Sequence, residues 1–78
     1  MGYKMSDAEI LQRISNTIRE EVECCTKPKS QIAKEIGVTT GALSQYFSGA
    51  AYPNLITLKK LCQSLGCSAD TILGIKLP

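Results

Sequence analysis

Residues 30–49, which read SQIAKEIGVTTGALSQYFSG, constrain the chain most, because they predict two short helices joined by a tight turn. Gly37 ends the first pattern where a helix C-cap glycine belongs, Thr39 or Thr40 offers the next helix a hydroxyl N-cap, and Gly49 ends the second pattern. Two helices this short are unstable alone, so they must pack on each other and on the rest of the chain. Apolar residues recur at helical spacing on both sides of the turn: Ile32, Ala33 and Ile36, then Leu43, Tyr46 and Phe47.

Three further helices are predicted around this pair. Ser6 and Glu9 form a capping box that opens a helix over about 7–23. Pro28 suits the first turn of the helix over 28–36, and Asn54 and Ser68 can cap helices over 55–65 and 69–73. The first and fourth helices each carry an apolar stripe that is expected to be buried. These stripes are Ile10, Leu11, Ile14, Ile18 and Val22 in the first helix, and Leu55, Leu58, Leu61, Cys62 and Leu65 in the fourth.

These patterns predict an all-α fold, a compact five-helix bundle around one core. In the helix over 40–48, Leu43 and Phe47 are expected to face that core, with Tyr46 flanking them. No segment alternates cleanly between apolar and polar residues, so strands are not expected. Residues 1–5 are expected to be a disordered leader, and residues 6–78 one domain, with the helix-turn-helix over about 28–48.

The chain resembles the Cro/repressor-type, lambda-repressor-like helix-turn-helix family of phage and bacterial regulators. The resemblance covers about residues 10–73 and is carried by Ile32-Ala33, Gly37-Val38, Leu43, Gly49, Pro53 and the run LITLKKLCQSLGCSADTIL. It implies the five-helix lambda-repressor-like bundle. It also implies a sequence-specific DNA-binding transcriptional regulator, with its recognition helix in the major groove of double-stranded operator DNA.

The helix over 40–48 is the expected recognition helix, because its outer face carries short, uncharged polar groups that can reach base edges. Gln45 can pair with adenine through two hydrogen bonds. The alternative for this helix face is an ordinary polar surface that binds nothing. For Tyr52, which follows the helix, the two alternatives are that its hydroxyl reaches a phosphate or that its ring packs against Pro53. The residues expected to contact bases are Thr40, Gly41, Ser44 and Gln45, and those expected to contact phosphates are Lys29, Ser30, Thr39, Ser48 and Tyr52.

The net charge of +2 is unevenly distributed along the chain. Residues 1–25 carry three basic and five acidic groups, whereas residues 26–60 carry five lysines and one glutamate. This asymmetry favours a polyanion as partner. However, Ala50 and Ala51 follow the recognition helix where relatives often carry lysine or arginine. That departure favours a second hypothesis, a protein-interaction module on the same fold, such as an antitoxin or antirepressor subunit.

Other functional classes have little support in the residues. Histidine is absent and no carboxylate pair suits acid–base work, so we expect no enzyme, no cofactor and no small-molecule substrate. The four cysteines lack the spacing of zinc sites, and with no signal peptide we expect reduced thiols and no metal. No apolar run approaches the roughly 20 residues of a membrane span. A cytoplasmic protein is therefore expected.

A homodimer is expected, because one recognition helix touches too few base pairs to select a genomic site. The C-terminal segment carries more apolar residues than so small a domain can readily bury. The alternative is that these residues close the core of a monomer. The residues expected to form the dimer contact are Ile72, Leu73, Ile75 and Leu77.

Overall fold

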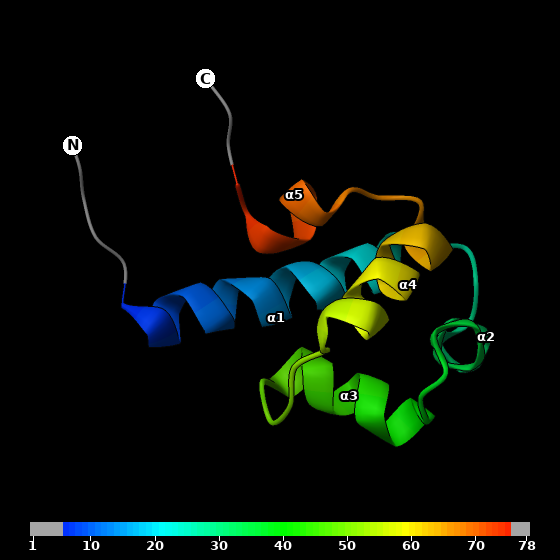
Figure 1. Ribbon diagram of the computed structural model, residues 1–78. Coiled ribbons are helices and arrows are strands. Elements are labelled where there is room, and N and C mark those ends of the chain that lie inside the picture. The colour runs from blue at the N-terminus through cyan, green and yellow to red at the C-terminus, as the bar shows by residue number, and fades with distance from the viewer. Residues whose placement is uncertain (1–5, 76–78) are drawn as a thin grey trace.

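The computed structural model describes residues 6–75, which form five helices and no strand (Figure 1). This confirms the predicted all-α bundle; the expected leader over 1–5 lies outside the described residues. The helices are α1 (Asp7–Cys24), α2 (Lys29–Ile36), α3 (Thr40–Ser48), α4 (Leu55–Leu65) and α5 (Ala69–Leu73).

Local capping groups set the ends of these helices. Ser6 Oγ accepts a hydrogen bond from the Glu9 N–H at 3.2 Å, and the Glu9 carboxylate accepts one from the Ser6 N–H at 3.1 Å, which confirms the predicted capping box. Thr39 is the N-cap of α3, so the choice between Thr39 and Thr40 falls on Thr39. Pro28 is the N-cap of α2 rather than its first residue. Asn54 and Ser68 cap α4 and α5 as predicted.

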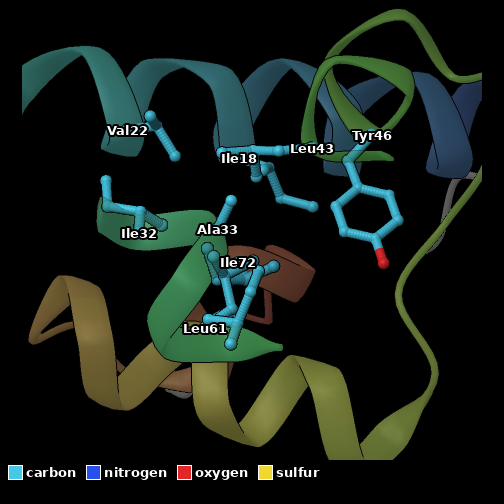
Figure 2. Close-up of a cluster of buried hydrophobic side chains, with 9 residues drawn as sticks. Ile18, Val22, Ile32, Ala33, Leu43, Tyr46, Leu61 and Ile72 are labelled. Atoms are coloured by element: carbon cyan, nitrogen blue, oxygen red, sulfur yellow. The ribbon is translucent and has the colours of Figure 1, made fainter. Parts of the chain in front are cut away.

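The five helices pack around one core, and the long helix α1 forms one side of it. Helix α1 contacts α3 and α5, which lie on opposite sides of it in Figure 1, while α2 packs against α3 and α4. The small side chain of Ala33 is buried where α2 meets its neighbours (Figure 2). The core is a single cluster drawn from all five helices: Ile18, Val22, Ile32, Ala33, Ile36, Leu43, Tyr46, Leu61 and Ile72.

Three of the expected buried stripes require correction. On α3, Tyr46 is buried and Phe47 is only half-buried, the reverse of the predicted order. On α4, Leu55 points outward and is 84% exposed. On α1, Ile10 and Leu11 are exposed at 40% and 38%, because 18 residues make a helix of about 27 Å, longer than the helices that cover it.

Candidate nucleic-acid interface

The exposed face of α3 carries every residue that the sequence predicts to read bases. Positions 40, 41, 44, 45 and 48 fall within one arc of a helix with 3.6 residues per turn, and all five are exposed. On the opposite side, Leu43 and Tyr46 are buried beside Ile18 of α1 (Figure 2). The packing of α3 on α1 therefore turns its uncharged polar face to solvent.

Thr39 has a structural role at the start of this helix. Its Oγ1 accepts a hydrogen bond from the Ala42 N–H at 3.0 Å, which caps α3. The hydroxyl proton of Thr39 remains free to donate, and the side chain is exposed. Thr39 can therefore cap the helix and donate to a phosphate oxygen at the same time.

The N-terminus of α2 offers an anion a partial positive charge. Pro28 provides no side-chain cap, so the first N–H groups of α2 are not satisfied by a capping side chain. Lys29 and Ser30 are both exposed there. The Lys29 ammonium lies 5.1 Å from the centroid of the Phe47 ring, a cation–π distance. This contact, which no sequence pattern indicated, holds the Lys29 charge beside the C-terminal half of α3.

The C-terminal end of α3 supports phosphate binding less well. The Ser48 hydroxyl already donates to the Gln45 carbonyl at 3.2 Å and accepts from the Ala50 N–H at 3.3 Å. A Cβ on Gly49 would lie 3.1 Å from Tyr52 Oη and 3.5 Å from Ser15 Oγ. The Tyr52 hydroxyl thus turns back toward the junction of α1 and α3, although the side chain is 39% exposed. Ser15 is fully buried there, and its Oγ has no hydrogen-bond partner among the described residues.

One lysine of the basic segment is used to hold the fold together. Lys27 Nζ lies 2.9 Å from Glu35 Oε1 and donates to the Ser64 carbonyl at 2.8 Å. Glu35 also accepts hydrogen bonds from the Ser64 hydroxyl at 2.6 Å and the Gln31 amide at 3.0 Å. These contacts lower the pKa of Glu35 from 4.5 to about 2. The hydrogen bond from the Ser64 hydroxyl has the largest effect, and the one from Lys27 the next largest. The junction ties α2 to the end of α4 and removes Lys27 from any phosphate-binding set.

The cysteines form no disulfide among the described residues. Cys24 is exposed, while Cys25, Cys62 and Cys67 are half-buried against the core. The pKa of the Cys67 thiol is raised to about 11, mainly by burial and to a smaller extent by the neighbouring Cys62. This thiol is therefore a poor nucleophile. Across residues 6–75, no cluster of cysteine and carboxylate side chains could hold a metal ion.

The predicted dimer surface is altered by the structure. Ile72 is 1% exposed and belongs to the core, so it is not available for a dimer contact. Leu73 and Ile75 are exposed at 39% and 51%, and Leu77 lies outside the described residues. Sequence reasoning missed that Ile10 of α1 lines a groove together with Leu73. No sequence pattern could reveal this, because the exposure of Ile10 depends on where α5 ends over α1.

In the part of the chain that the structure describes, no helix is both long enough and apolar enough to cross a membrane. Neither the curated proteins nor the solved structures compared with this chain gave a significant match. The family model HTH_3, described as helix-turn-helix, matches residues 26–72, which is more than half of the chain and spans α2, α3, α4 and most of α5. The chain therefore belongs to the lambda-repressor-like helix-turn-helix family of DNA-binding regulators.

Proposed function

We propose that this protein is a sequence-specific transcriptional regulator of phage or bacterial type that places α3 in the major groove of an operator. The observation that carries the proposal is the division of α3 into two faces. Its buried face packs on α1, and its exposed face presents Thr40, Gly41, Ser44 and Gln45 without a charged group. Gln45 pairs with adenine, and Thr40 contacts a base through its hydroxyl or its methyl group.

Phosphate contacts flank this helix in the proposed complex. Lys29 and Ser30 at the N-terminus of α2 bind one phosphate, with the Lys29 charge kept close to α3 by Phe47. Thr39 donates to a second phosphate. Ser48 and Tyr52 contribute less, because the Ser48 hydroxyl is already bonded and the Tyr52 hydroxyl faces Gly49. The affinity of a single domain is therefore expected to be modest and dependent on salt.

The regulator is proposed to act as a homodimer in the cytoplasm, with Leu73 and Ile75 in the contact. Ile10 extends the same apolar surface, since α1 contacts α5 and the groove between them is lined by Ile10 and Leu73. This surface lies on the side of α1 away from α3 (Figure 1). Pairing there leaves the exposed face of α3 free, and two copies would read half-sites roughly 34 Å apart.

A protein-interaction module with little DNA binding is the second candidate. It is favoured by the C-terminal end of α3, which is followed by Ala50 and Ala51 rather than by basic residues, and where the hydroxyls of Ser48 and Tyr52 are turned to the protein. A chain of this kind would use the same bundle to bind another protein, as an antitoxin or antirepressor subunit does.

Electrophoretic mobility shifts with random duplexes and with duplexes selected by the protein, at two salt concentrations, separate the two candidates. The regulator should bind selected duplexes more tightly than random ones at both salts, and Lys29→Ala should weaken both and lower the salt slope by about 1. Equal, weak binding to all duplexes would instead support the protein-interaction module.

A further inference from the structure

The outer face of α4 carries two apolar side chains that the core does not use. Leu55 is 84% exposed and Ile56 is 69% exposed, more than any other large apolar side chain in the described residues. Both stand in the first turn of α4, immediately after the Asn54 N-cap. Adjacent, exposed apolar residues on a rigid helix mark a candidate contact surface.

Two lysines follow these residues at helical spacing. Lys59 and Lys60 stand four residues after Leu55 and Ile56, so each lies on the same side of α4 one turn further along. Both are exposed, and neither forms an ion pair with any residue that the structure describes. Glu35, which lines an adjoining groove with Lys60, forms its ion pair with Lys27 instead.

Grooves on either side of this helix face share the same wall. Leu55, Lys59 and Gln63, spaced four residues apart, line both grooves. Neither groove is lined by a carboxylate. The surface is therefore apolar at the start of α4 and basic one turn later, an arrangement complementary to an apolar stripe flanked by acidic groups.

The charge pattern and the area decide between the possible occupants. A second copy would bring two further lysines to this surface and no carboxylate to pair with them. The few side chains of this surface also offer much less than the roughly 800 Å² per partner of a stable dimer. Duplex DNA could pair with the lysines, but phosphates have no favourable contact for Leu55 and Ile56. A partner that is both acidic and apolar satisfies both halves of the surface.

We propose that Leu55, Ile56, Lys59 and Lys60 form a docking surface for an acidic amphipathic helix of a partner protein. Apolar side chains of that helix pack on Leu55 and Ile56, and its carboxylates pair with Lys59 and Lys60. This is helix-in-groove recognition, with anchors at i, i+3, i+4 and i+7 on the partner. An interface of this size is weak and transient, as in signalling encounters. The proposal does not depend on how α3 reads DNA.

The test uses the full chain and a stapled synthetic helix with leucines at i, i+3, i+4 and i+7 and glutamates on both flanks. Backbone amide NMR shifts should change along α4 on titration with this peptide. A matched peptide with lysine at every glutamate position should bind at least ~10-fold more weakly, since like charges repel. The double substitution Lys59→Glu with Lys60→Glu should weaken binding of the acidic peptide to a similar degree.

Further variants separate the surface from general effects of charge and folding. Leu55→Ser with Ile56→Ser should weaken binding without changing the melting temperature, because both side chains are mainly exposed. Lys34→Glu, an exposed lysine on α2, is the matched control and should leave binding unchanged. The proposal is overturned if both peptides bind equally or if neither shifts α4. It is also overturned if α4 shifts with protein concentration alone, as a second copy would cause, or if duplex DNA displaces the peptide from these residues.

Discussion

Substitution of Gly49 by alanine should destabilise the protein more than the same substitution at Gly37. Both glycines end a helix with left-handed backbone, at φ values of 82° and 79°. That conformation costs a residue with a Cβ about 1–2 kcal/mol, so both variants carry this penalty. The two sites differ in their surroundings: a Cβ at Gly37 meets nothing within 4 Å, whereas one at Gly49 lies 3.1 Å from Tyr52 Oη.

The additional cost at Gly49 comes from crowding against the Tyr52 hydroxyl. Overpacking costs typically about 1–3 kcal/mol, so Gly49→Ala should lose about 2–5 kcal/mol in total and Gly37→Ala about 1–2 kcal/mol. Removal of the hydroxyl in Tyr52→Phe should restore most of the difference. The Tyr52→Phe substitution alone should change stability by less than about 0.5 kcal/mol, as exposed positions usually do.

Urea unfolding followed by circular dichroism measures these free energies, and a double-mutant cycle between positions 49 and 52 isolates the contact. For a domain of this size each 1 kcal/mol corresponds to about 4–8 °C in melting temperature, so the effect is easily resolved. The reasoning is refuted if Gly49→Ala and Gly37→Ala cost the same. It is equally refuted if Tyr52→Phe leaves the cost of Gly49→Ala unchanged.

Three further results are expected. Because the pKa of Glu35 is lowered to about 2, its contribution to stability should be complete above about pH 4.5 and lost as the pH falls toward 2; urea unfolding should show a flatter acid profile in Glu35→Gln, and an unchanged profile would contradict this. The melting temperature should be the same with and without reductant or chelator, since the cysteines are free. A drop of many degrees on adding reductant or chelator would instead show a stabilising disulfide or metal site. Sedimentation from micromolar to millimolar concentration should show a dimer for the wild type and a monomer for Leu73→Glu with Ile75→Glu; a wild type that stays monomeric and binds its operator non-cooperatively rules out the C-terminal dimer.

The helices could be predicted because their ends depend on neighbouring residues. The Ser6–Glu9 capping box joins residues three positions apart, and Thr39, Asn54 and Ser68 each cap a helix by accepting a hydrogen bond from the N–H three residues on. Such bonds are encoded within a single turn. The exposed face of α3 followed in the same way from its local pattern of polar and apolar residues.

What could not be predicted depends on segments far apart in the chain. Tyr46 and Phe47 differ by about 100° around α3, and only the position of α1 decides which of them is buried. The exposure of Leu55 likewise depends on which side of α4 packs against α2 and α5. The Lys27–Glu35–Ser64 junction joins residues up to 37 positions apart, so no local sequence pattern predicts it.

The central claim is that the exposed face of α3 reads bases, and selection of binding sites from a random duplex pool tests it most directly. The wild type should select one motif, and Gln45→Ala should relax one base position and lose about 1–3 kcal/mol on the selected site. Gln63→Ala, an exposed glutamine on α4, is the control and should select the wild-type motif with unchanged affinity. A wild type that selects no motif, or a Gln45→Ala variant that selects the same motif with the same affinity, would contradict the claim.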